Sequence, residues 1–183
     1  MKLRLPPAVA LCGPIGSGKT AVAEYLAVRH DYRPCKFAGP LKAMLQTLGL
    51  EKEHLEGHSK EAPCDLLGGL TPRHAMQTLG TEWGRGCMGP DFWVRMWERQ
   101  ARWRMKFEER IVADDARFPN EVEAVRSLGG VALLIRRPGT SPVALHESER
   151  RFSELAGTKL VVNDGTLEEL YARVDEALAE GKA

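Results

Sequence analysis

The chain has 183 residues, of which 43% are apolar and 28% are charged, and its formal net charge is +1. These values are typical of one compact globular domain that builds its core without disulfide staples. The near-neutral charge argues neither for nor against an acidic partner, because it can hide local patches. No apolar run approaches the ~18 residues of a membrane span, so no membrane partner is expected. The four cysteines form no CxxC pair, which argues against a zinc ribbon or a redox dithiol and favours a reducing cytoplasm.

The first half of the chain alternates apolar runs with polar loops. Residues 8–11 predict a strand, and apolar residues at helical spacing in 21–29 predict a helix after a glycine-rich loop. A second helix is expected at 40–48, where a glycine follows its end. The polar stretch 51–69 indicates a loop or a short irregular helix. A helix over 71–80 is expected to begin on a threonine cap followed by proline and to close at a glycine.

The second half continues the alternation. We expect a helix at 91–109, a strand at 110–113, a helix at 119–128, a strand at 131–135, a polar loop at 136–147, a short helix, a strand at 159–163 and a helix at 166–179. Strands that alternate with helices predict a parallel sheet with helices on both faces, an α/β fold.

The strongest motif is the glycine-rich loop at residues 13–20, which matches GxxxxGK[ST]. Its glycines let backbone N–H groups surround an anion, and the next helix presents its positive end to the same anion. Lys19 is expected to reach the β- and γ-phosphates, and Thr20 to supply a hydroxyl to Mg²⁺. The predicted nucleotide-binding set is Gly13, Ile15, Gly16, Ser17, Gly18, Lys19 and Thr20. The fold class is therefore predicted to be that of P-loop NTPases.

A Rossmann dinucleotide site is the alternative for a glycine-rich loop after a strand. The glycines here run G-x-x-G-x-G, whereas the Rossmann fingerprint is G-x-G-x-x-G. No acidic residue ends the next expected strand, near residues 36–37. Both observations favour the P-loop.

An acidic element completes a P-loop site by holding Mg²⁺ from the end of a neighbouring strand. The strand at 110–113 is followed by Asp114 and Asp115, and Arg117 lies two residues further on, within reach of the same phosphates. Adjacent residues of an extended chain point in different directions, so only one of the two carboxylates is expected to face the metal.

Several segments together resemble the bacteriophage deoxynucleoside monophosphate kinase family. The resemblance is carried by residues 37–42, 71–73, 77–85, 115–121 and 146–149, and it extends from the glycine loop to residues 163–165. It implies a nucleotide-kinase fold, ATP and Mg²⁺ as cofactors, and transfer of the γ-phosphoryl of ATP to a deoxynucleoside monophosphate. The family pattern keeps the acid two residues before the arginine, which ranks Asp115 above Asp114 as the metal ligand.

The phosphate-binding residues expected from this chemistry lie in loops and at helix starts. An acceptor phosphate is already ionised, so positioning and charge neutralisation replace a general base. Lys19, Arg117 and Arg136 are the candidate catalytic residues, and Arg137 is a candidate ATP contact. Lys42, Arg73, Gln77, Trp83, Arg85 and Glu149 are the candidate acceptor-binding residues; Arg85 is expected in a loop, and Trp83 either stacks on the acceptor base or packs in the core.

The predicted organisation is one kinase domain over residues 1–183, with an acceptor-binding helical region at about 36–110 and a lid-like loop at about 136–150. The helix at 91–109 is amphipathic, with a tryptophan face expected in the core and a solvated basic stripe opposite. No nucleic-acid partner is therefore expected, while this helix is the candidate interface of a homodimer. A kinase of another small metabolite and a nucleotide-dependent ATPase or switch remain the alternative functions.

Overall fold

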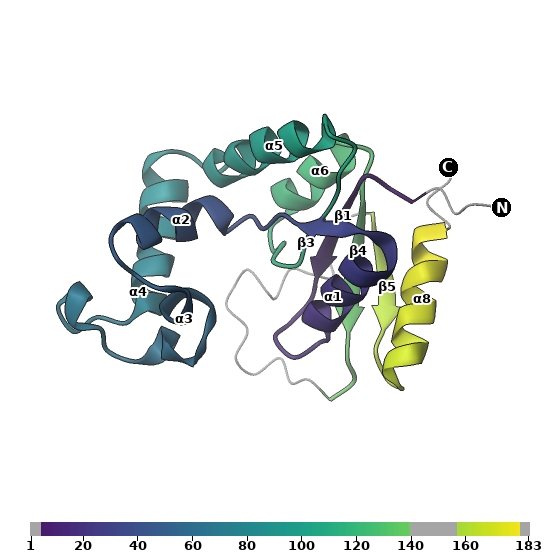
Figure 1. The fold of residues 1–183 in the computed structure, drawn as a ribbon, viewed down its shortest axis with the longest axis horizontal. Helices are drawn as coiled ribbons and strands as arrows, with labels where there is room; N and C mark the ends of the chain where they lie inside the picture. The colour runs from purple at the N-terminus through teal and green to yellow at the C-terminus, as the bar shows by residue number, and fades with distance from the viewer. Residues whose placement is uncertain (1–4, 140–156, 180–183) are drawn as a thin grey trace. The chain divides into compact units, whose positions relative to one another are not determined.

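A computed structural model of the chain describes residues 5–139 and 157–179, and it is built around a five-stranded parallel sheet (Figure 1). The strands are β1 (Ala8–Cys12), β2 (Tyr32–Pro34), β3 (Arg110–Ala113), β4 (Val131–Arg136) and β5 (Thr158–Val162). Their order across the sheet is β2-β3-β1-β4-β5, and every neighbouring pair is parallel. The sheet confirms the predicted α/β fold, and it places the carboxyl ends of β1 and β3 side by side.

The chain divides into two compact units. The sheet unit holds residues 5–36, 100–139 and 157–179 of the described chain, and the helical unit holds residues 37–99. The helical unit falls inside the region predicted to bind the acceptor. Part of the loop predicted as a lid, and Glu149 within it, lie outside the described residues.

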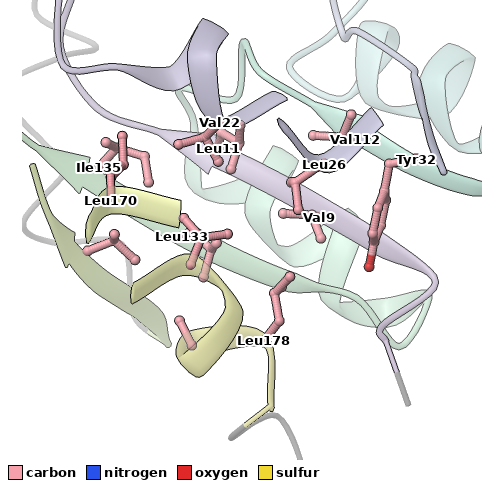
Figure 2. Packing of buried hydrophobic residues seen from close by; sticks show 13 residues of the cluster. Val9, Leu11, Val22, Leu26, Tyr32, Val112, Leu133, Ile135, Leu170 and Leu178 are labelled. Carbon is pink, nitrogen blue, oxygen red and sulfur yellow. The ribbon is translucent and has the colours of Figure 1, made fainter. Parts of the chain in front are cut away.

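One face of the sheet packs against α1 (Lys19–His30) and α8 (Leu167–Ala179). Side chains alternate along a strand, so β1 sends Val9 and Leu11 to this face. Figure 2 shows Val9 beside Leu26 and Leu11 beside Val22, both from α1, with Leu178 of α8 in the same cluster. This packing fixes the strand and the helix that border the glycine loop.

The opposite face of β1 carries small side chains. Ala8 and Ala10 are fully buried there, and α6 (Pro119–Ser127) contacts both β1 and β4. Val122 and Val125 of α6 are buried as well. Alanines let a helix approach a sheet closely, so the helix that follows β3 lies directly beneath the strand that leads into the glycine loop.

The helical unit is built from short helices that cover a small leucine core. Its elements are α2 (Gly39–Thr47), α3 (Lys52–Glu56), η1 (His58–Glu61), η2 (Asp65–Leu67), α4 (Pro72–Gln77), η3 (Thr78–Cys87) and the start of α5 (Phe92–Met105). Leu45, Leu50 and Leu55 form the buried core. Thr71 accepts a hydrogen bond from the His74 N–H and Pro72 follows it, which confirms the predicted start of α4.

The predicted end of that helix at Gly80 is wrong. The chain continues from α4 into the π-helical η3, where the Met88 N–H donates to the Trp83 carbonyl five residues earlier. Gly80 does not take the left-handed conformation that ends helices, and its carbonyl accepts a hydrogen bond of 2.8 Å from the Trp93 indole. Arg85 therefore lies in a helix, and its prediction as a loop residue is corrected.

Helix α5 has the predicted amphipathic character. Trp93, Trp97 and Ala101 are buried, whereas Arg95 and Arg99 are exposed. Trp97 stacks on Phe37 with ring centroids 4.5 Å apart. The helix ends at Met105 rather than at residue 109, because the chain enters the left-handed region soon afterwards, with a φ of 60° at Glu108.

The second strand lies earlier than predicted. It covers Tyr32–Pro34 instead of residues 36–37, and it pairs with β3 in the register Tyr32↔Arg110. Tyr32 is 1% exposed and anchors the strand in the core. Pro34 is tolerated because β2 is an edge strand, where one side of the backbone needs no ladder partner.

All four cysteines are free, and they differ in burial. Burial raises the pKa of Cys12 to about 12 and that of Cys35 to about 11. A thiol with a pKa near 12 is ionised in only about one molecule in 10⁴ at pH 8, and the thiolate is the reactive form. In the native protein at pH 8 we expect a maleimide or disulfide reagent to modify exposed Cys87 first and Cys64 more slowly. Cys12 and Cys35 should react only after unfolding, and their rapid labelling in mass spectra of the native protein would contradict this packing.

Within residues 5–139 and 157–179, none of the helices combines the length and the apolar character that crossing a lipid bilayer requires.

Candidate active site

The glycine loop, residues 13–20, follows β1 and ends in the first turn of α1. Gly13 has a φ of 134°, and a Cβ there would lie 2.2 Å from the carbonyl oxygen of Ile135 at the end of β4. A side chain at this position would be strained and would clash with backbone, so the close passage of the loop beside β4 requires glycine.

Lys19 folds back over this loop. Its ammonium donates hydrogen bonds of 2.6 Å to the Gly13 carbonyl and 2.7 Å to the Pro14 carbonyl. The loop thus carries a positive charge at its mouth, beside the N-terminus of α1, where backbone N–H groups lack helical partners. An anion with several oxygens suits this arrangement.

The other residues of the loop divide by burial. Ser17 is fully buried, and its Oγ has no hydrogen-bond partner among the described residues. Ile15 is 75% exposed, and Thr20 is exposed in the first turn of α1. The Thr20 hydroxyl therefore lies where solvent or a metal ion has access.

The acidic element lies at the same edge of the sheet. Strands β1 and β3 pair in parallel with Ala10 opposite Ala113, so Asp114 and Asp115 emerge next to the start of the glycine loop. Asp114 Oδ2 accepts from the Lys36 ammonium at 3.0 Å, whereas its Oδ1 is buried without a partner among the described residues. The sheet thus brings together the two elements that the sequence predicted as partners.

These oxygen donors suit a hard divalent cation. Mg²⁺ is bound through one or two carboxylates, hydroxyls, waters and substrate phosphates rather than by an all-protein cage. The described residues contain no cluster of three or more histidine, cysteine or acidic side chains that could form such a cage. The buried, unpartnered Oδ1 of Asp114 is the atom that a metal ion or one of its waters would satisfy.

Glu121 has a role that the sequence analysis missed. It is 4% exposed in the first turn of α6, and its Oε2 accepts hydrogen bonds from the backbone N–H groups of Arg117 at 2.6 Å and Phe118 at 3.1 Å. The carboxylate therefore fixes the turn that carries Asp115 and Arg117. The sequence contains a signal for this role. Glu121 lies three residues after Phe118 and two after Pro119, which is the position from which an acidic side chain bonds back to the start of a helix in a capping box.

Replacing Glu121 should damage both stability and the site. Glu121→Ala leaves two N–H groups without their acceptor, and a lost hydrogen bond to a charged group costs about 1.5–3 kcal/mol. Because the donors are partly buried, we expect the free energy of unfolding in urea to fall by roughly 2–4 kcal/mol. Glu121→Gln keeps a carbonyl acceptor and should lose less than half as much. Exposed Glu123→Ala is the matched control on α6, and equal losses in the two alanine variants would contradict the capping role.

The candidate acceptor-binding residues belong to the helical unit. The Lys42 ammonium lies 3.0 Å from Glu56 Oε1, and Arg73 pairs with Glu61. Two cations on α2 and α4 are thus each held by a carboxylate from α3 or η1, and neither has the free side chain that a solvated surface charge would have.

The remaining candidates differ in their surroundings. Gln77 is exposed at the end of α4. Trp83 packs edge-on against Phe92 with ring centroids 5.4 Å apart, so part of its surface lies within an aromatic cluster. Arg85 donates to the Pro90 carbonyl at 2.9 Å. Arg136, the last residue of β4, and Arg137 are exposed. These two, with the glycine loop and Arg117, belong to the sheet unit.

Comparisons with known proteins agree on one family. The family model for deoxynucleotide monophosphate kinase matches residues 67–174. A protein of Acanthamoeba polyphaga mimivirus, provisionally named a deoxynucleotide monophosphate kinase, is 32% identical over 180 residues, covering 91% of this chain and 93% of its own length. The deoxynucleotide monophosphate kinase of Escherichia phage RB69 is 28% identical over 107 residues, covering 58% of this chain and 44% of its own.

Solved structures support the fold. A Thermus thermophilus protein aligns with a TM-score of 0.53 at 20% identity, covering 97% of this chain and 98% of its own. A Chloroflexus aurantiacus protein provisionally described as a kinase aligns with a TM-score of 0.51 at 12% identity and the same coverage. Together with the family match, the edge of the sheet that bears the glycine loop and the acidic element identifies this chain as a member of the deoxynucleotide monophosphate kinase family and as a phosphotransferase.

Proposed function

We propose that this protein transfers the γ-phosphoryl group of ATP to a deoxynucleoside monophosphate and forms the diphosphate. The observation that carries the proposal is the glycine loop, in which the Lys19 ammonium bonds to the carbonyls of Gly13 and Pro14. The strand before this loop pairs with β3, which two aspartates follow. Family membership then narrows the reaction from phosphate binding in general to transfer onto a nucleotide.

The donor side of the site consists of the glycine loop and its neighbours. Backbone N–H groups of residues 13–20 would bind the ATP phosphates, and Lys19 would neutralise charge on the group in transfer. Thr20 and Asp115, or Asp114, would hold Mg²⁺, which neutralises phosphate charge when it is bound. Exposure of Thr20 and the buried, unpartnered Asp114 Oδ1 support an oxygen-lined metal position here.

The reaction needs no general base. The acceptor is a phosphate oxygen that is already ionised, so the protein has to position two anions and offset their repulsion. Arg117 and Arg136 are proposed to neutralise the transferring group, and Arg137 to contact ATP. All three arginines are exposed residues of the sheet unit that also holds the glycine loop, which supports these roles.

The acceptor side is proposed to use the helical unit. Lys42 and Arg73 would bind the acceptor phosphate, while Gln77, Trp83 and Arg85 would contact the nucleoside. The carboxylates of Glu56 and Glu61 now hold the two cations. Partly exposed ion pairs contribute only about 0–1 kcal/mol, so an incoming phosphate dianion can replace these partners at low cost. Glu149 is proposed as a further contact.

A panel of acceptors tests the proposal. ADP release is measured with ATP, Mg²⁺ and each deoxynucleoside or ribonucleoside monophosphate in turn, with product identified by mass spectrometry. We expect ADP release that depends on a deoxynucleoside monophosphate and yields its diphosphate. Activity only with an unrelated metabolite would assign a different kinase, and a steady ATPase rate that no monophosphate changes would assign a nucleotide-dependent switch.

The setting proposed for this activity is the cytoplasm, which the four free cysteines support. A homodimer through α5 stays a prediction. Trp103 and Phe107 are 59% and 64% exposed and stack edge-on with centroids 5.0 Å apart, and they are the surface that such a dimer would use. Sedimentation velocity of the wild type and of Trp103→Glu measures the outcome.

A further inference from the structure

Three polar or charged residues are buried among the described residues, and all three follow strands of the sheet at its carboxyl edge. They are Ser17 after β1, Glu121 after β3 and Asn163 after β5. Burying a polar side chain is costly unless it makes hydrogen bonds, so each calls for a partner. The partner of Asn163 is the glycine loop itself.

Asn163 makes one hydrogen bond through its backbone and another through its side chain. Its backbone N–H donates to the Arg136 carbonyl at 2.8 Å, which extends the β4–β5 pairing by one residue. Its side-chain Nδ2 donates to the Ser17 carbonyl at 2.8 Å, across 146 positions of sequence. The side chain therefore connects the end of β5 to the middle of the glycine loop.

The hydrogen bond from Asn163 sets the orientation of the Ser17–Gly18 peptide. A trans peptide is planar, and its C=O and N–H point in opposite directions. Because Asn163 holds the Ser17 carbonyl on its own side, the N–H of Gly18 points away from Asn163. Gly18 has a φ of 108°, and a Cβ there would lie 2.6 Å from Asn163 Nδ2 and 3.5 Å from Leu170 Cδ2. Asn163 and Leu170 thus form a wall on one side of the loop, and the Gly18 N–H faces the other.

We propose that Asn163 is a positioning residue for the nucleotide site, fixing the Ser17–Gly18 peptide so that the Gly18 N–H is presented to the bound phosphates. The proposal rests on the proposed function, because it assumes that residues 13–20 bind a nucleotide. Without the Asn163 hydrogen bond, the Ser17–Gly18 peptide can rotate. The Ser17 carbonyl, which carries partial negative charge, then turns toward the phosphates. The loop would then lose a donor and gain a repulsive contact.

The expected result is a loss of nucleotide affinity. A hydrogen bond to a charged group corresponds to roughly 10- to 100-fold in a binding constant. We expect Asn163→Ala to weaken ADP binding, measured calorimetrically without acceptor, by roughly 10-fold or more. In steady-state assays the KM for ATP should rise by a similar factor, while kcat stays within about 3-fold, because an interaction present equally in the ground and transition states affects KM alone.

One further variant distinguishes the loss of the hydrogen-bond donor from the loss of side-chain volume, and another serves as a control. Asn163→Asp keeps the size of the side chain but replaces the donor by a carboxylate, so it should bind ADP at least as weakly as Asn163→Ala. Arg173→Met is the control, because Arg173 pairs with Asp164 and donates to the Val162 carbonyl, so these bonds hold the same β5–α8 connection rather than the Ser17 carbonyl. It should leave ADP affinity unchanged. Binding is measured at 10 °C, with the thermal midpoint of each variant recorded, so that the proteins compared are folded.

The outcomes distinguish this proposal from the proposed function. Unchanged ADP affinity in Asn163→Ala, or wild-type affinity in Asn163→Asp, overturns the positioning role even if the wild type phosphorylates deoxynucleotides. A fall in kcat with unchanged KM overturns it too, because that result means only a smaller folded fraction. Weaker ADP binding in both variants supports the role, even if the acceptor panel reveals another acceptor.

Discussion

Lys19→Met should abolish phosphoryl transfer while leaving the fold intact. The ammonium is a cation bonded directly to the glycine loop, at 2.6 Å from the Gly13 carbonyl and 2.7 Å from the Pro14 carbonyl. Removing a single preorganised donor from a transition state costs about 10²–10³ in rate, and a full positive charge is worth at least as much. We therefore expect kcat/KM to fall by roughly 10³-fold or more in the coupled ADP-release assay.

The stability cost of the same change should be small. Two hydrogen bonds are lost, but the site is partly exposed and water can reach the freed carbonyls, so about 1 kcal/mol is expected in the free energy of unfolding. Lys106→Met, on an exposed position of the same unit, is the matched control and should retain full activity. If Lys19→Met kept activity after purification on two different matrices, the loop would not be the site of transfer.

The site elements were predictable where local sequence determined them. The strand before Asp114 was predicted at residues 110–113 and found at Arg110–Ala113, because a short buried apolar run that ends in two acids allows one interpretation. The start of α4 was predictable for the same reason, since Thr71 and Pro72 form a cap on their own. Proximity of the strand at 110–113 to β1 was predicted because a P-loop site needs an acid at the end of a neighbouring strand, and the pairing of β1 with β3 provides it.

Other features depend on contacts that a local pattern does not contain. Strand β2 has three residues, one of them Pro34, and it exists because Tyr32 is buried and β3 lies beside it. The chain stays helical past Gly80, and the carbonyl of that residue accepts a hydrogen bond from Trp93, 13 residues further along the chain. The roles of Glu121 and Asn163 rest on hydrogen bonds to backbone groups, and any residue type offers the same backbone group, so the sequence of the partner carries no signal.

The two aspartates after β3 can be told apart by their effect on the Mg²⁺ requirement. We expect Asp115→Asn to lower kcat/KM by roughly 10²-fold and to raise the Mg²⁺ concentration for half-maximal rate, because an amide is a weaker ligand than a carboxylate. Asp114→Asn should have the smaller effect, since Lys36 already offsets that charge at 3.0 Å and the lysine, 36% exposed, can return to water. Both variants are titrated with Mg²⁺ at fixed ATP and saturating acceptor.

One feature of Asp114 favours the opposite result, in which Asp114→Asn has the larger effect on the Mg²⁺ requirement. Asp114 carries the buried oxygen without a partner, and a metal-bound water would satisfy it. A larger rise in the Mg²⁺ requirement for Asp114→Asn than for Asp115→Asn would therefore assign the metal to Asp114 and leave Asp115 to position Arg117. Thr20→Val, which removes the third proposed oxygen, supplies the reference shift. If neither asparagine variant moved the Mg²⁺ requirement while Thr20→Val did, the acidic element would not serve the metal at all.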